Sequence, residues 1–225
     1  AKSIISGDVL NAIMYRIRPY EVEAGSTDRA LVECREGIME PLRTKKSILR
    51  ALYRCRKILE QVKVDRTLVK PKISVIGEFW AMTTEGDGNY HLQRFLEQEG
   101  AEVDIQLITN WILYNIWQAN VDTRQRMRLR GADLTARKGL KTTEVGKKFV
   151  ILKVAEWVLK GTFYTFAKLL GLSNYHLPDM NENASLASKH YNTELRGGEG
   201  HMEVGKLIQT VIHHKAHMVI SVKPF

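Results

Sequence analysis

The sequence predicts an α/β fold in which a helical N-terminal segment is followed by a Rossmann-like parallel-sheet domain with a long helical insertion. Three observations lead to this prediction. Apolar residues recur at helical spacing through the first third of the chain. The pattern changes at Pro71, where a short β-branched run, KISVIGEFW, indicates a buried strand. Strand, loop, helix and strand then follow one another between residues 72 and 108, which is the order of a βαβ unit.

The helical N-terminal segment is predicted over residues 1–66. Its apolar spacing predicts three helices, over residues 8–18, 27–42 and 46–62. We expect Asp8 to cap the first helix and Ser26 or Thr27 to cap the second, because the side-chain oxygens of these residue types bind the free amides at helix N-termini. Pro19 is expected to end the first helix, since proline disfavours helical geometry in the residue before it.

The Rossmann-like domain is predicted over residues 67–225. Its first strand covers residues 72–78, a helix covers about 89–99, and the second strand covers about 102–108. Strands that are joined through a helix pair in parallel, and their crossover is right-handed. We therefore expect these two strands to be parallel, with the helix crossing between them.

A long helical insertion is predicted within that domain at about 110–182. It contains helices over residues 110–131 and 144–170, joined by a polar, basic connection, and a loop over residues 171–185. A helix over 201–215 then leads to a last strand over 216–225. If this last strand lies beside the first, the loops that follow the two strands share one edge of the sheet.

The charge of the chain limits its partners. The 225 residues carry a formal net charge of +9, with basic residues spread over 43–72 and 124–148. Leucine and isoleucine alternate with them at helical spacing, which favours a solvent-exposed helix face. No aromatic–basic ladder or recognition-helix pattern occurs, so we expect no nucleic-acid partner. No apolar run approaches the roughly 20 residues that a membrane helix needs, and no signal peptide occurs, so we expect no membrane partner.

Cysteine usage indicates the compartment. The chain has two cysteines, Cys34 and Cys55, and both fall in predicted helices. So few cysteines exclude a secreted disulfide scaffold. Because free cysteine is among the most buried residue types, we expect both to be reduced packing residues in a cytoplasmic protein.

Three stretches of the sequence resemble one known family. They are RIRPYEVEAGSTDRA at 16–30, PKISVIGEFWAMTTEGDGNYHLQRFLEQEGAEV at 71–103 and GGEGHMEVGKLIQTVIHHKAHMVISVKPF at 197–225. They are similar to the long-form 2-hydroxyacyl-CoA dehydratases and the related CoA-enzyme activase iron–sulfur proteins. The stretch at 71–103 is the most specific, because several uncommon residues occur in it together. The insertion at 110–182 matches only loosely.

The resemblance implies a place in anaerobic metabolism. Members of this family use ATP hydrolysis in an actin-like domain to drive low-potential electrons onto a cysteine-ligated [4Fe–4S] or double-cubane cluster, where a CoA thioester or small molecule reacts. In relatives, a cysteine-containing turn follows at once on the residues that match Pro224 and Phe225. The resemblance therefore implies a domain fragment of a longer ATP-dependent redox protein, which works with other domains or subunits.

The chain does not carry that chemistry by itself. A [4Fe–4S] cluster needs about four thiolates, and the sequence also lacks a P-loop for ATP. We therefore expect no cofactor in this chain, and a role as scaffold and part of the pocket wall near the cluster. The alternative is a stand-alone interaction module that docks an acidic partner through the basic helices. A self-sufficient hydrolase or dehydrogenase is disfavoured, because neither GxSxG nor a dinucleotide fingerprint occurs.

The candidate catalytic residues are Glu78, Asp87 and Glu199. Glu78 ends the first strand, Asp87 lies in the loop after it, and Glu199 precedes the helix that returns to the last strand. Because open α/β sheets bind ligands at the carboxyl ends of their strands, we expect these carboxylates to converge there and exchange protons. They would repel CoA phosphates, which leaves Arg94 or Lys223 to hold CoA. The alternative is that each carboxylate caps its own loop.

Histidine spacing gives a weaker signal. His213 and His217 have the i,i+4 spacing with which a helix can bind a metal ion, but no third ligand is nearby in the sequence. We therefore expect no metal site.

Overall fold

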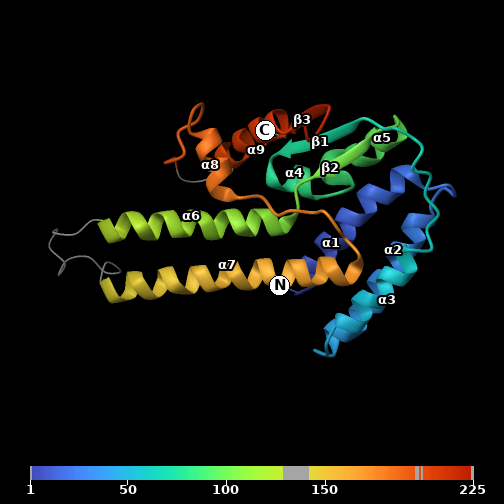
Figure 1. Cartoon of the computed structure of the whole chain (residues 1–225), viewed down its shortest axis with the longest axis horizontal. Helices are drawn as coiled ribbons and strands as arrows, with labels where there is room; N and C mark the ends of the chain where they lie inside the picture. The colour runs from blue at the N-terminus through green and yellow to red at the C-terminus, as the bar shows by residue number, and fades with distance from the viewer. Residues whose placement is uncertain (1, 129–141, 196–197, 199, 224–225) are drawn as a thin grey trace.

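The computed structural model describes residues 2–128, 142–195, 198 and 200–223. Within these residues the protein is a mixed α/β fold, with helices packed around a three-stranded parallel sheet (Figure 1). The strands are β1 (Lys72–Gly77), β2 (Glu102–Ile105) and β3 (Met218–Val222). The α-helices are α1 (Lys2–Ile17), α2 (Ser26–Arg43), α3 (Leu49–Leu59), α4 (Phe79–Thr83), α5 (Leu92–Gln98), α6 (Ile108–Arg128), α7 (Thr142–Leu170), α8 (Met180–Ala187) and α9 (Gly200–Ile212). Two 3₁₀ helices, η1 (Arg18–Tyr20) and η2 (Asp87–Asn89), complete the elements.

The sheet has β1 in its centre, and both neighbours run parallel to it. Ser74 of β1 stands opposite Asp104 of β2 and Val219 of β3. The chain passes from β1 to β2 through α4, η2 and α5, so the predicted βαβ unit with parallel strands is confirmed. The first strand also pairs with the last, so the loops that follow these two strands share one edge of the sheet. The second strand is shorter than predicted, because it ends at Ile105 and α6 begins at Ile108.

The two faces of the sheet differ in character. Ile73 and Val75 of β1 are buried in the apolar core to which the side chains of α1 belong. Side chains of a strand alternate between its faces, so Ser74 points to the opposite side. On that side Ser74 and Lys206 of α9 both contact the carboxylate of Asp104. One face of the sheet is therefore an apolar layer against α1, and the other carries polar side chains below α9.

Asp8 does not cap the first helix as predicted. That helix begins earlier, at Lys2, and Asp8 lies buried within it. Its carboxylate accepts hydrogen bonds from the backbone amides of Ile108 (3.2 Å) and Thr109 (2.6 Å). These are free amides at the start of α6. Asp8 therefore caps the N-terminus of a helix that begins a hundred residues later in the sequence, and it links α1 to α6.

The predicted cap of the second helix is also wrong. Gly25, in the left-handed conformation, occupies the N-cap position of α2 and lacks a side chain that could bind the free amides. Glu21 binds them instead, because its carboxylate accepts hydrogen bonds from the amides of Gly25 (2.6 Å) and Thr27 (2.8 Å). Ser26 adds its hydroxyl to the same carboxylate, at 3.3 Å.

The prediction that Cys34 and Cys55 are free, buried packing residues is confirmed. Helices α2 and α3 pack against each other, with one cysteine from each facing the other helix. Each thiol lies near the backbone carbonyl of the other cysteine, at 3.6 and 3.5 Å. The hydrogen bond with Cys55, together with burial, raises the pKa of Cys34, so its thiol stays protonated and unreactive.

Helices α6 and α7 lie side by side as a long pair (Figure 1). Buried Phe163, Phe166 and Leu170 lie toward the end of α7, the helix that packs on α1 and α3. The basic connection predicted between the two helices, at residues 132–143, lies outside the described residues except for its last two residues, which belong to α7. The predicted division into domains 1–66 and 67–225 stays a prediction. No helix in the described part of the chain combines the length and apolar character that crossing a bilayer requires.

Part of the segment predicted as a loop at 171–185 is a helix, α8. Asp179 is its N-cap and accepts a hydrogen bond from the amide of Asn181 at 2.8 Å. Pro178 precedes the cap and Glu182 follows three residues after it, which is a helix-start pattern that the sequence already contained. The helix packs closely on α9, because Gly205 leaves room for the backbone carbonyl of Asn183.

Candidate functional site

The carboxyl edge of the sheet is formed by the ends of β1 and β3. Gly77 has φ +124°, and a Cβ atom there would lie 2.2 Å from the carbonyl oxygen of Val222. Only glycine permits this close approach of the two backbones. The amide of Glu78 donates a hydrogen bond to the same oxygen, at 2.9 Å. The two strand ends are therefore held together, and the chain leaves β3 beside Glu78.

Glu78 lies at this edge, half-buried, at the N-cap position of the short helix α4. Its side chain makes no hydrogen bond to the amides of that helix. The capping alternative therefore has no support at Glu78. Its carboxylate stands where open α/β sheets bind ligands.

The convergence of the three candidate carboxylates stays a prediction. The backbone of Asp87 lies in η2, between α4 and α5, but its side chain lies outside the described part of the structure. Glu199 is also outside it. Its neighbour Gly198 is held near α6, because the hydroxyl of Tyr114 donates a hydrogen bond to the Gly198 carbonyl oxygen at 3.0 Å.

The loop between α4 and α5 is organised from inside by Asn89. This side chain is buried, and its Nδ2 lies 2.8 Å from the carbonyl oxygens of Ala81 and Thr84 and from Oε1 of Gln93. The side-chain amide of Gln93 also donates a hydrogen bond to the Thr84 carbonyl oxygen, at 2.8 Å. The loop that carries Asp87 therefore has a defined backbone path.

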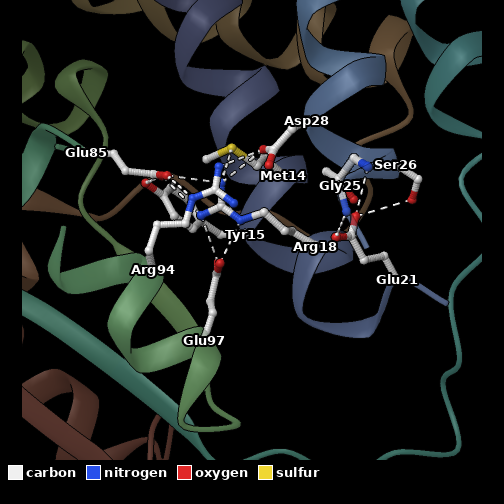
Figure 2. A network of polar contacts seen from close by, with 11 residues as sticks. Met14, Tyr15, Arg18, Glu21, Gly25, Ser26, Asp28, Glu85, Arg94 and Glu97 are labelled. Atoms are coloured by element: carbon white, nitrogen blue, oxygen red, sulfur yellow. Dashed lines mark hydrogen bonds and ion pairs between the residues drawn. The ribbon is translucent and has the colours of Figure 1, made fainter. Parts of the chain in front are cut away.

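Near this loop, Arg18, Arg94, Asp28, Glu85 and Glu97 form an ion-pair network (Figure 2). It was not predicted from the sequence. The Arg18 side chain is 3% exposed, and its guanidinium hydrogen-bonds to the carboxylates of Glu85 and Glu97, with Asp28 as a third, more distant ion-pair partner at 3.5 Å. It contacts Glu97 at 2.6 and 3.0 Å and Glu85 at 3.1 Å twice. Arg94 binds Glu85 and Asp28, each at 2.7 Å. Helices α2 and α5, η1 and the loop at Glu85 are thereby joined by charge-assisted hydrogen bonds.

The pKa values in this network follow from burial and from the arginines. Burial alone would raise the pKa of Glu85, but hydrogen bonds from Arg18 and Tyr15 hold it below its usual value. Burial prevails at Glu97, whose pKa is raised although Arg18 binds it. Burial and the charge of Glu85 raise the pKa of Tyr15. Glu85 is therefore firmly ionised at neutral pH, and Glu97 is the carboxylate of the pair that takes up a proton more readily.

A cavity of about 400 Å³ lies beside the network, between α1, α2 and the segment that carries Glu85. Its wall also includes Asn11, Met14, Leu31, Val32, Arg35 and Thr83. The two carboxylates in the wall, Asp28 and Glu85, are each bound by arginine. Neither is free to act as a general base, so we interpret the network as a structural link. The sequence contained one indication of this network. Arg18 follows Leu10 and Met14 at i,i+4 spacing, and because those two residues are buried, the spacing indicates that Arg18 is buried too.

The residues suggested for holding CoA are engaged by carboxylates. Arg94 binds Asp28 and Glu85, and Lys223 lies 3.0 Å from Glu203. Both side chains would have to leave these partners to bind phosphate, which counts against this suggestion.

The two histidines with metal-binding spacing contact different partners in the structure. His213 lies 3.2 Å from Glu182, and Nδ1 of His217 accepts a hydrogen bond from the amide of Lys72. No group of three or more histidine, cysteine, aspartate or glutamate side chains that could hold a metal ion occurs among the described residues.

Comparisons of this chain with known proteins found no similar protein. No protein-family model matches the chain, and no significant match was found to any curated protein or to any solved structure.

Proposed function

We propose that this chain is a Rossmann-like domain of a cytoplasmic, ATP-dependent iron–sulfur redox protein of the 2-hydroxyacyl-CoA dehydratase and activase type. One observation carries the proposal. The three stretches that resemble this family lie far apart in the sequence but meet in the fold. Arg18 and Asp28, from the first stretch, bind Glu85, Arg94 and Glu97 of the second. The second and third stretches pair as β1 and β3. The resembling residues thus form one unit rather than scattered similarities.

The proposed role is to form part of the substrate pocket wall at the carboxyl edge of the sheet. Glu78 stands at this edge without a capping contact, and the chain leaves β3 next to it. In the proteins that the chain resembles, a cysteine-containing turn follows this last strand. The proposal therefore puts Glu78 beside that turn, facing the CoA thioester or small-molecule substrate.

The described residues do not fit an iron–sulfur cluster of their own. The chain has two cysteines, both buried between α2 and α3 rather than at the sheet edge. A [4Fe–4S] cluster needs about four thiolates. In this proposal the cluster ligands and the ATP site therefore come from other domains or subunits, and this chain is not catalytic alone.

The test uses the natural polypeptide that contains this chain. Its reading frame past the codon of Phe225 should encode a cysteine within a few residues. The polypeptide, purified without oxygen, should hold iron and sulfide and should act on a CoA thioester or a small molecule when ATP and an electron donor are supplied. A stop codon at that place, together with a protein free of iron, would contradict the proposal.

A second candidate function rests on the tip of the α2–α3 pair. Arg43, Lys45, Lys46 and Arg50 are exposed around the turn between these helices, and they form no ion pair with any described residue. Such a cluster would suit an acidic partner protein. This alternative predicts salt-sensitive binding of an oligo-glutamate peptide that Lys45→Glu/Lys46→Glu abolishes and Lys189→Glu, elsewhere on the surface, does not. Equal binding by both variants would remove its support.

A further inference from the structure

One side of helix α7 carries a row of exposed apolar side chains, here called the α7 stripe. Its members occupy positions i, i+1, i+4, i+7 and i+8, which lie on one face of a helix. They are Val150, Ile151, Val154, Trp157 and Val158, and between 51% and 77% of each residue is exposed. Gly161 continues this face, and the space that a Cβ atom would occupy there is open.

The opposite side of α7 is buried. Leu159, Phe163, Phe166 and Leu170 belong to the apolar core, and α7 packs on α6, α1 and α3. In Figure 1 the part of α7 that carries the stripe lies beside α6 and extends past α1 and α3. The α7 stripe is therefore a second apolar face of the helix, separate from the core.

The size of the α7 stripe indicates a binding surface. A large aromatic side chain offers about 150–250 Å² of contact area, and Trp157 is 77% exposed. With its four aliphatic neighbours it gives an apolar patch of several hundred Å², and patches of this size mark interaction sites. From Val150 to Gly161 the face is about 16 Å long, which suits the apolar face of a second helix laid along it.

Lysines surround the α7 stripe. Lys147 and Lys148 lie just before it, and Lys168 lies about two turns past Gly161. These three lysines are exposed and form no ion pair with any described residue. Glu144 is an exposed carboxylate near the start of the helix. The flank toward α6 adds two lysines that share one carboxylate, namely Lys153, Lys160 and Glu156. The surroundings of the stripe therefore carry a net positive charge.

We propose that the α7 stripe binds an amphipathic helix of a partner polypeptide. The apolar side chains of that helix cover the stripe, and glutamate or aspartate residues beside them meet the lysines, since complementary charges select the partner across an interface. A second copy of this chain is disfavoured, because it would place the same net positive surface against itself. This surface goes beyond the proposed function and does not depend on it.

Fluorescence anisotropy with the purified 225-residue chain tests the proposal. The probe is a labelled peptide of three heptads with leucine at a and d and glutamate at e and g, whose self-association the glutamates oppose. One comparison peptide replaces the glutamates by lysine, and another replaces the leucines by glutamine. We expect the probe to bind and each comparison peptide to bind at least about tenfold more weakly. Failure of the probe to bind, or equal affinity for either comparison peptide, would overturn the proposal.

Matched variants locate the binding surface, with far-UV circular dichroism as the check of folding. Trp157→Gln should weaken binding about tenfold or more, because buried tryptophans are frequent hot spots. Trp80→Gln changes a similarly exposed tryptophan on α4 and should leave the affinity unchanged. Lys147→Glu/Lys148→Glu should shift the preference toward the lysine peptide. Equal losses in both tryptophan variants would refute the site.

Sedimentation and vesicle binding test the other possible occupants of the α7 stripe. We expect the chain to sediment as a monomer and to leave vesicles of phosphatidylglycerol and phosphatidylcholine unbound. A dimer that Trp157→Gln dissociates would assign the stripe to a second copy of the chain. Vesicle binding that the same variant abolishes would assign it to a membrane surface. Either result would overturn the proposed partner helix.

Discussion

Replacing Arg18 by methionine should cost this protein much of its stability. The guanidinium is 3% exposed and is bound by the carboxylates of Glu97, 8% exposed, and Glu85, 21% exposed. Glu85 keeps Arg94 at 2.7 Å and the Tyr15 hydroxyl at 2.6 Å in the variant. Glu97 has no other ion pair in the described part of the chain. Removing one partner of a buried ion pair lowers the free energy of unfolding by about 3–5 kcal/mol. Because only Glu97 is left without a partner in Arg18→Met, we expect a loss near the lower end, about 3 kcal/mol.

The pH dependence of this loss has a definite sign. The pKa of Glu97 is already raised by burial in the intact protein, and removal of its arginine raises it further. A carboxylate whose folded pKa is above its unfolded pKa destabilises the fold above the folded pKa, and this cost disappears as pH falls below the unfolded value. The destabilisation by Arg18→Met should therefore be largest at neutral pH and should shrink as pH falls through the raised pKa of Glu97.

Urea unfolding followed by far-UV circular dichroism, at neutral pH and about pH 5, measures both effects. The double variant Arg18→Met/Glu97→Gln should recover much of the loss, because no buried charge is then left unpaired. Arg29→Met, which removes an exposed ion pair with Glu23, should change stability little. A loss under about 1 kcal/mol for Arg18→Met, without pH dependence, would show that the network behaves like a surface ion pair and would refute the reasoning.

Three further predictions follow from single sites. Gly77→Ala should lower stability by about 3 kcal/mol or prevent β3 from pairing, because a Cβ at this positive φ meets the Val222 carbonyl; unchanged urea unfolding would contradict this. Asp8→Ala should cost about 1–2 kcal/mol, since α6 loses its cap, and hydrogen exchange should speed up in the first turn of α6; unaltered exchange there would speak against the cap. Anaerobic treatment of this chain with iron and sulfide should leave no stable cluster, since Cys34 and Cys55 are buried and too few; stoichiometric iron after gel filtration would sink this expectation.

The strands were predictable because their signals are local. The run from Ile73 to Gly77 is β-branched and bounded by turn residues, and the helix after it follows within one βαβ unit. Parallel pairing then follows from the helical crossover between the two strands. Helix α8 was missed although Asp179 and Glu182 mark its start, because a polar, proline-containing segment was interpreted as a loop.

The long-range contacts were not predictable from spacing. Asp8 looked like a local cap, but its partner amides lie at Thr109, and no sequence pattern records a contact across such a separation. Glu21 rather than Ser26 binds the amides of α2, since the loop at Gly25 turns the Glu21 carboxylate toward them. Of the candidate site, the position of Glu78 directly after the first strand could be predicted, whereas the network around Arg18 needed the fold to bring its members together.

The placement of Glu78 in a substrate pocket is tested most directly by the turnover of the natural polypeptide carrying Glu78→Gln, measured with a CoA thioester under anaerobic conditions. Glu99→Gln, an exposed carboxylate at the end of α5, is the control. The account predicts that Glu78→Gln lowers turnover by about 10²-fold, the lower limit for a group that transfers protons. Iron content and the unfolding midpoint should stay unchanged, and the control should be fully active. Unchanged turnover in Glu78→Gln would contradict the proposed site and leave this residue a structural one.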